Sequence, residues 1–210
     1  MNNFINGNSF SEVAHFKIDR DNKFLSTELF RSNAIIFCKT DYLEILFDFI
    51  KLSARKYILI THMSDYPINE IEFCQAPRSI IKWYAENAVY DHPNLISIPL
   101  GLGNNIGGSK APPWYKYDWF IDNADNLKLI DKDNKLYCNW NPNTNHEIRG
   151  PILEILKKME HNLAIEYGVS FEQYCENMSH HKYVICPPGN GVDTHRLWES
   201  LYLKTIPITT

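Results

Sequence analysis

The chain has 210 residues, of which 44% are hydrophobic and 13% aromatic, and a formal net charge of −4. This composition provides for a packed core in one large or two small domains and is unlike that of a disordered chain. No Lys/Arg-rich run indicates a nucleic-acid surface, and no apolar run reaches the roughly 18 residues of a membrane span. The N-terminal stretch MNNFINGNSFSEV lacks the basic start and apolar core of a secretory signal, so we expect a cytoplasmic protein.

Hydrophobic patterning predicts alternating strands and helices in the first half of the chain. Thr40 or Asp41 is the expected N-cap of the first helix, and Pro77 with Ser79 marks the expected start of the second. The expected elements are strands at 34–38, 56–61 and 95–99 and helices at 41–52 and 79–87. This βα order predicts a parallel sheet with right-handed crossovers.

The second half begins after a Gly/Pro/Asn-rich stretch, 101–113, which we interpret as a linker. An aromatic cluster at 114–120 follows it, and we expect this cluster to cover a domain interface. Further elements are expected as strands at 127–130 and 136–139, helices at 147–162 and 171–179, and a terminal strand–helix–strand unit at 183–209. These boundaries divide the chain into domains 1–113 and 114–210, the second with about three strands.

The five cysteines and the acidic triplets give no sign of a metal site. The cysteines are odd in number and widely spaced, and no two of them form a CxxC pair, so we expect neither a zinc site nor a disulfide framework. Two Asp-x-Asp triplets, 19–21 and 131–133, lie in charged, turn-like contexts and are interpreted as solvated loops. We therefore expect neither a metal nor another cofactor.

The most informative stretch is YVICPPGNGVDTHRLWESLYLKTIPITT, residues 183–210. A β-prone run at 183–186 meets a Pro/Gly turn at 187–191, a helix is expected at 195–203, and a last strand at 205–209. In such a βαβ unit, free N–H groups of the turn and of the first helical turn form a site for phosphate. Arg196 can pair with a phosphate, and Glu199, one turn later, can accept from ribose hydroxyls.

This stretch resembles the donor-binding motif of exostosin-like glycosyltransferases: a Pro-Gly turn, Asp-Thr-His-Arg, an aromatic residue, Glu, then Ile-Pro. KYILITHMSDYPI (56–68), KWYAENAVYDHPNLISIPLGL (82–102) and LYCNWNPNTNHEIRGPI (136–152) are similar to further segments of small microbial and viral members. The resemblance covers roughly 34–210. It implies the GT-B architecture, two small Rossmann-like halves with a cleft between them, and transfer of a sugar from a nucleotide diphosphate sugar to a hydroxyl, on a glycan.

The resemblance also implies roles for individual residues. The second half would hold the nucleotide sugar, with Arg196, Arg149 and turn amides on the diphosphate and Glu199 on ribose or sugar hydroxyls. The full expected donor set is Asn139, Asn143, Arg149, Pro188, Gly189, Asn190, Gly191, Asp193, Thr194, His195, Arg196 and Glu199. The first half would face the acceptor, and His62 or Asp65, after the strand at 56–61, would be the base of an inverting reaction.

Several structural alternatives stay open at this point. Asp193 or Thr194 can be a simple N-cap, Arg196 and Glu199 a solvated pair, and Asp65 a turn residue that bonds its own backbone. Members of the family continue beyond the last strand, so the second half is expected to be incomplete. The alternative to an enzyme is therefore a non-catalytic nucleotide-sugar-binding protein, or a truncated, inactive one.

Overall fold

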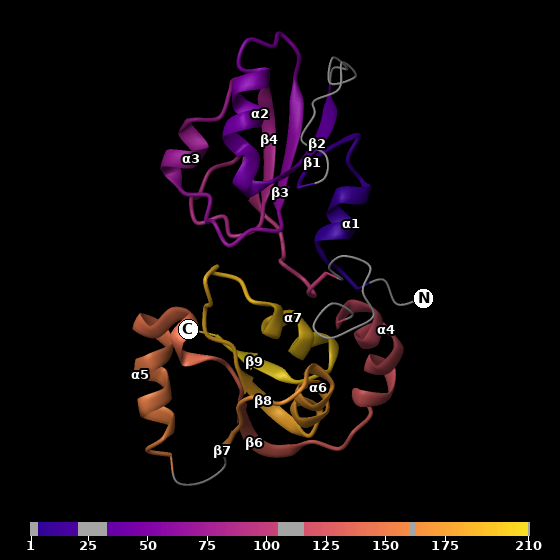
Figure 1. Ribbon diagram of the computed structural model, residues 1–210, viewed down its shortest axis with the longest axis vertical. Coiled ribbons are helices and arrows are strands. Elements are labelled where there is room, and N and C mark those ends of the chain that lie inside the picture. The colour runs from indigo at the N-terminus through magenta and orange to yellow at the C-terminus, as the bar shows by residue number, and fades with distance from the viewer. Residues whose placement is uncertain (1–3, 21–32, 105–115, 160–162, 210) are drawn as a thin grey trace. The chain divides into compact units, whose positions relative to one another are not determined.

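The computed structural model describes residues 4–20, 33–104, 116–159 and 163–209, which form two compact units of mixed α/β structure (Figure 1). Ile5–Leu100 is the N-terminal unit, and Gly101–Thr210 with Met1–Phe4 is the C-terminal unit. The division falls at the start of the stretch expected as a linker. Residues 105–113 of that stretch lie outside the described residues.

The N-terminal unit is built on a five-stranded parallel sheet with the order β1-β2-β3-β4-β5. Strands that follow one another in the chain are therefore neighbours in space. Its elements are α1 (Gly7–Glu12), β1 (Phe16–Ile18), β2 (Ala34–Lys39), η2 (Thr40–Tyr42), α2 (Leu43–Ile50), β3 (Tyr57–His62), α3 (Glu70–Cys74), β4 (Ile80–Ala85) and β5 (Leu95–Ser97).

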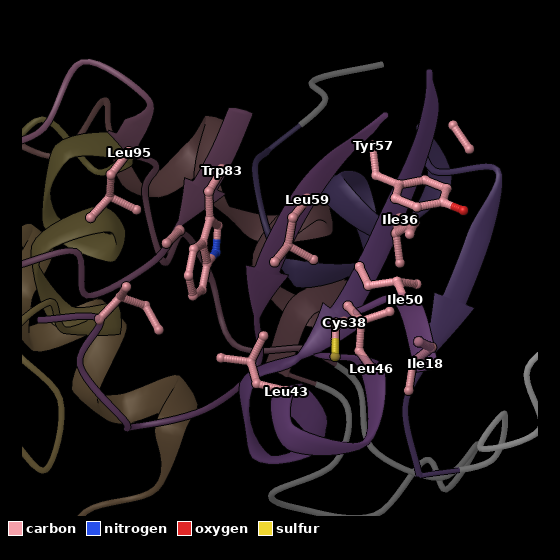
Figure 2. Close-up of a cluster of buried hydrophobic side chains, with 13 residues drawn as sticks. Ile18, Ile36, Cys38, Leu43, Leu46, Ile50, Tyr57, Leu59, Trp83 and Leu95 are labelled. Atoms are coloured by element: carbon pink, nitrogen blue, oxygen red, sulfur yellow. The ribbon is translucent and has the colours of Figure 1, made fainter. Parts of the chain in front are cut away.

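The core of this unit lies between one face of the sheet and α2 (Figure 2). Ile36 pairs with Leu59, and Leu59 with Trp83, so alternate residues of three strands line the same face. Leu46 and Ile50 of α2 pack against them, and all five side chains are essentially inaccessible to solvent. Alternate residues of the strands and residues spaced one helical turn apart in α2 therefore pack together in one buried layer.

The C-terminal unit is built on a four-stranded parallel sheet with the order β7-β6-β8-β9. Its elements are α4 (Lys116–Leu127), β6 (Asp133–Cys138), η3 (Pro142–Asn145), α5 (His146–Leu156), β7 (Leu163–Ile165), α6 (Phe171–Ser179), β8 (His181–Ile185), α7 (His195–Tyr202) and β9 (Ile206–Ile208). Both faces of the sheet are used. Tyr137 and Val184 join a core with α4 and α6, whereas Cys138 and Ile185 pack with Leu156 of α5.

The structure confirms the parallel α/β class and most expected elements, and it corrects several. The helix expected at 79–87 is the strand β4, because Ile80, Ile81, Trp83 and Tyr84 are β-branched or aromatic and fit a half-buried pleat. The strand expected at 127–130 is the end of α4 and a turn. The C-terminal sheet has four strands and not the expected three, because β7 adds a strand beside β6.

Helix boundaries needed smaller corrections. The first helix starts as a 3-10 turn at Thr40–Tyr42, and neither Thr40 nor Asp41 caps α2, whose N-cap is Tyr42 without a side-chain hydrogen bond. The helix expected to reach residue 162 ends at Leu156. Of the aromatic cluster at 114–120, residues 116–120 open α4, where the Phe120 ring packs against that of Phe4 with centroids 5.5 Å apart.

Candidate functional site

The strand order of the C-terminal unit creates a place for a ligand at the carboxyl ends of β6 and β8. From β6 the chain moves outward to β7, and from β8 it moves outward in the opposite direction to β9. Loops that leave neighbouring strands in opposite directions leave a crevice, and open α/β sheets bind their ligands there. The loop after β6 (139–141) and the turn after β8 (186–194) meet at this point, so most of the expected donor set is brought together.

Arg149 of α5 joins these two loops. Its Nε donates to the carbonyl of Pro188 at 2.8 Å, Nη1 to that of Asn141 at 3.0 Å, and Nη2 to that of Pro187 at 3.4 Å. The side chain is buried, and Asn145 adds a bond from Nδ2 to the carbonyl of Gly189 at 2.9 Å. Arg149 was expected to bind the diphosphate, but most of its donors are directed at backbone carbonyls, so its first role is to shape the site.

Gly189 leaves room for the Arg149 side chain beside the turn. A Cβ at residue 189 would lie 3.0 Å from Nη2 of Arg149, which is closer than an ordinary contact. The glycine therefore serves close approach of the guanidinium to the turn, and the turn closes with a bond from Gly189 N–H to the carbonyl of Gly191 at 3.1 Å.

Asp193 orders the start of α7. Its Oδ1 accepts from the N–H of Thr194 at 2.7 Å, and its Oδ2 accepts from the indole Nε1 of Trp198 at 2.7 Å. Thr194 is the N-cap residue, but its side chain caps nothing. Instead its Oγ1 is buried without a hydrogen-bond partner among the residues that the structure describes.

Arg196, in the first turn of α7, is the cation without a partner at this site. Its Nε is buried, and within the described part of the chain its guanidinium forms no hydrogen bond or ion pair. It lies over the ring of Tyr174, with its guanidinium carbon 5.7 Å from the ring centroid. A buried donor without an acceptor is unfavourable, so Arg196 and Thr194 together favour an anionic, hydrogen-bonding ligand.

The electrostatics of the site point the same way. Burial and then the positive charge of Arg196 lower the pKa of Arg149, so the two guanidinium groups are near enough to repel. Burial also opposes the charge on Arg196, but Tyr174, Glu199 and neighbouring thiols raise its pKa above the usual value. Both arginines remain charged, and an anion between them would relieve the repulsion.

Glu199 lies one turn after Arg196 on α7. It is buried, and its Oε2 accepts from the hydroxyl of Tyr174 at 2.8 Å. It is therefore not part of a solvated pair with Arg196. Tyr174 was not among the donor-site residues expected from the sequence, because no local motif in α6 indicates a binding role for it.

The other expected donor residues differ in their surroundings. Asn139 donates from Nδ2 to the Tyr137 hydroxyl at 3.0 Å, whereas Asn143 is exposed and its N–H donates to Oδ1 of Asn141 at 2.9 Å. His195 is exposed, and its Nδ1 donates to the carbonyl of Gly101 at 2.8 Å. In the turn, Asn190 is exposed and Gly191 is buried.

The N-terminal unit holds a buried His–Glu pair at the carboxyl ends of β3 and β4. Nδ1 of His62 lies 2.9 Å from Oε2 of Glu86, and the two side chains are 1% and 0% exposed. Nδ1 also faces the N–H of Met63 at 2.8 Å, and Nε2 donates to the carbonyl of Pro99 at 3.1 Å. Since both ring nitrogens are engaged inside the unit, this arrangement does not suit a base that must reach an acceptor hydroxyl.

Both strands of the pair end in strained backbone. Met63 and Asn87, which follow His62 and Glu86, have φ of 67° and 51°, a region that non-glycine residues seldom adopt. Glu86 was missed because it fell within the helix expected at 79–87. Asp65 is exposed in the loop after β3.

A scan against protein-family models finds no match to this chain, and a search of curated proteins finds no similar sequence. No helix in the described ranges has the length and apolarity needed to cross a membrane. Residues 4–20, 33–104, 116–159 and 163–209 contain no group of three or more His, Cys, Asp or Glu side chains that could hold a metal ion.

Proposed function

We propose that the protein is a glycosyltransferase of the exostosin-like type that binds the diphosphate of a nucleotide sugar at the carboxyl ends of β6 and β8. The observation that carries the proposal is Arg196, a half-buried arginine whose Nε is buried without a hydrogen-bond partner among the described residues. A diphosphate supplies the acceptor oxygens that Arg196 and the hydroxyl of Thr194 lack. The resemblance of residues 186–208 to the family's donor motif supports the same ligand.

In this proposal the charge that develops on the leaving diphosphate is stabilised by fixed donors. Arg196 pairs with the phosphates, and the N–H groups at the start of α7 add the positive end of the helix dipole. Arg149 holds the two loops in the shape that the ligand needs. Glu199, held by Tyr174, is proposed to accept from a ribose or sugar hydroxyl with its other oxygen.

We propose Asp65 rather than His62 as the base that removes the proton of the acceptor hydroxyl. Asp65 is exposed at the end of β3, whereas His62 is enclosed with Glu86 and the carbonyl of Pro99. Asp65→Asn should then lower turnover by about a hundredfold or more while nucleotide affinity stays unchanged. Turnover is measured as release of nucleoside diphosphate from a panel of nucleotide sugars.

Binding is tested first, by the melting temperature of the chain with a panel of nucleoside diphosphates and their monophosphates. A ligand that binds only the native state raises the melting temperature, and we expect one diphosphate to do so more than its monophosphate. If no nucleoside diphosphate raises it, the proposed site is wrong. Binding without release of nucleoside diphosphate would favour the alternative, a non-catalytic nucleotide-sugar-binding protein.

Arg196→Met tests the residue on which the proposal depends. It should weaken nucleoside diphosphate binding by about 2 kcal/mol or more, since a charge-assisted bond to phosphate is lost. Without ligand it should change the free energy of unfolding by less than about 1 kcal/mol, because its Nε leaves no bonded partner behind. Arg78→Met, at an exposed arginine of the N-terminal unit, is the matched control. Equal affinity of the Arg196 and Arg78 variants would contradict the assignment.

A further inference from the structure

Glu166 carries a carboxylate at the carboxyl end of β7. It follows Ile165, the last residue of that strand, and its N–H donates to the carbonyl of Cys138, the last residue of β6, at 3.0 Å. Since β7 and β6 are neighbours in the sheet, Glu166 lies beside Asn139, the first residue of the loop that enters the candidate site. Neighbouring strands are about 5 Å apart, so this carboxylate is within one or two strand spacings of the ends of β6 and β8.

A chain of hydrogen bonds holds one oxygen of Glu166. Its Oε2 accepts from the hydroxyl of Tyr137 at 3.1 Å and from Nδ2 of Asn177 at 2.6 Å. The Tyr137 hydroxyl in turn accepts from Nδ2 of Asn139 at 3.0 Å. Oδ1 of Asn177 accepts from Nε2 of Gln173 at 2.7 Å. Each bond fixes the direction of the next, so the carboxylate is held from β6 and from α6.

The second oxygen of Glu166 remains an acceptor without a donor. Burial raises the pKa of the Tyr137 hydroxyl, and the charge of Glu166 acts in the same direction, so the hydroxyl keeps the proton that it donates to Oε2. Oε1 forms no hydrogen bond or ion pair among the residues that the structure describes, and the side chain is half-buried. A fixed carboxylate with one unused oxygen suits a ligand that carries hydroxyl groups.

The place of Glu166 in the sheet favours the hydroxyls of a ribose. In a βαβ unit that binds a nucleotide, the phosphates lie at the end of the first strand, and an acidic residue at the end of the second strand accepts from the ribose. β6, α5 and β7 form such a unit, and Glu166 follows its second strand. Arg196 follows β8, on the other side of β6. A nucleotide whose phosphates pair with Arg196 can therefore extend its ribose across β6 to β7.

We propose that Glu166 recognises the ribose of the nucleotide sugar, so that the ligand is a ribonucleoside diphosphate and not a deoxyribonucleoside diphosphate. Oε1 of Glu166 accepts from a ribose hydroxyl, while Tyr137 and Asn177 hold the carboxylate in place. This inference rests on the proposed function, because it needs a nucleotide with its diphosphate at Arg196. Glu199, the other carboxylate of the site, is then available to a hydroxyl of the transferred sugar.

The affinity of the wild-type chain for matched nucleotides is the first test. The probes are the diphosphates of adenosine, guanosine, cytidine and uridine, together with the 2′-deoxy and 3′-deoxy analogues of each one that binds. We expect at least one analogue to bind about tenfold or more weakly, because a hydrogen bond to a charged group is lost. Equal affinity for the ribonucleotide and both analogues overturns the inference. The proposed function still stands in that case, provided that Arg196→Met weakens binding. If no nucleoside diphosphate binds, both are wrong.

Glu166→Gln tests the residue itself. The amide oxygen of the variant can still accept from Tyr137 and Asn177, which turns the amide NH2 toward the ligand and removes the acceptor. We expect the affinity for the ribonucleotide to fall about tenfold or more and the preference over the deoxy analogue to disappear. Without ligand, the melting temperature should stay within about 4 °C of wild type.

Glu176→Gln, at an exposed glutamate of α6, is the matched control for Glu166→Gln and should keep the preference for the ribonucleotide. A Glu166→Gln chain that prefers the ribonucleotide as strongly as the wild type does overturns the assignment of this residue. Should that variant fail to fold, the comparison of nucleotides on the wild-type chain decides the question.

Discussion

The two units share the same βα alternation but differ in strand order. In the N-terminal unit every connection moves one strand further in the same direction, from β1 to β5. In the C-terminal unit the direction reverses between β6 and β8. Because a crevice forms where connections diverge, alternation alone predicts the fold class, whereas strand order decides which unit offers this kind of site.

The buried ionisable groups show the same contrast. In the N-terminal unit His62 and Glu86 approach each other at 2.9 Å, and the N–H of Ser64 donates to the second oxygen of Glu86 at 2.5 Å. In the C-terminal unit the buried Nε of Arg196 has no hydrogen-bond partner among the described residues. The carboxylate of Glu86 has a histidine beside it within its own unit, although its Oε2 forms no hydrogen bond among the described residues, whereas no carboxylate forms an ion pair with Arg196 in the described part of the chain.

Removal of Arg149 should have the largest effect and should act on one unit alone. Arg149→Ala leaves the carbonyls of Asn141, Pro187 and Pro188 without their donor, and we expect a loss of about 3–5 kcal/mol in the free energy of unfolding. Amide hydrogen exchange resolved by residue is the measurement, with faster exchange expected in β6 and β8. Unchanged protection of β8 would mean that Arg149 does not hold these loops.

A matched variant in the N-terminal unit sharpens this comparison. Leu59→Ala opens a cavity beneath α2 and should cost about 3 kcal/mol. Faster exchange is then expected in β2 and β3. Should either variant speed exchange equally in both sheets, the two units unfold as one and the contrast between them is lost.

A smaller effect is expected at Gly189. Gly189→Ala places a Cβ 3.0 Å from Nη2 of Arg149, so the guanidinium must shift from its carbonyl partners. We expect a loss of about 1–2 kcal/mol in the free energy of unfolding, measured by urea denaturation. Gly168→Ala is the comparison variant. Gly168 has a φ of 71° and no neighbour within 4 Å of a Cβ, so the loss of stability in this variant measures backbone strain without crowding. In the double variant Gly189→Ala/Arg149→Ala the two losses should not add, since the clash needs the guanidinium.

Much of the fold was predictable because local signals agreed with tertiary structure. Strands such as β2 and β3 are short apolar runs, and the Pro/Gly turn after β8 can be neither helix nor strand. The N-cap of α6 is Ser170, whose side chain accepts from the N–H of Gln173. The donor set came together because most of its members follow β6 and β8, which are neighbours in the sheet.

The predictions from the sequence that were wrong or incomplete have physical reasons. Ser79 before an apolar run looks like a helix start, but the aromatic and β-branched residues of β4 fit the pleat between β3 and β5. The hydrogen bonds of Arg149 depend on carbonyls 38 and 39 residues away, and Tyr174 reaches Arg196 and Glu199 from another helix. Such long-range partners leave no periodic pattern in the sequence.

The smallest predicted effect is a pH dependence at the carboxyl end of β2. Burial alone would raise the pKa of Asp41, but hydrogen bonds from Lys39 and Ser64 bring it below the usual value. A carboxyl with a lowered pKa in the folded state stabilises the fold above its unfolded pKa, and that stabilisation disappears as pH falls through the folded value. Asp41 is about one third exposed, so solvent screening limits the contribution to about 0.5 kcal/mol or less.

Asp41→Asn should therefore lower the free energy of unfolding slightly at pH 7, and this difference from wild type should shrink as pH falls through the folded pKa of Asp41, where the wild-type carboxyl becomes protonated. Urea denaturation of both proteins at pH 7, 5 and 3 measures the difference. Lys39→Met provides the control: it removes the cation 2.8 Å from the carboxylate and should raise the pKa of Asp41 in an NMR titration. A difference between Asp41→Asn and wild type that grows as pH falls has the opposite sign and would contradict the assignment, because it would mean that the folded state favours the protonated acid.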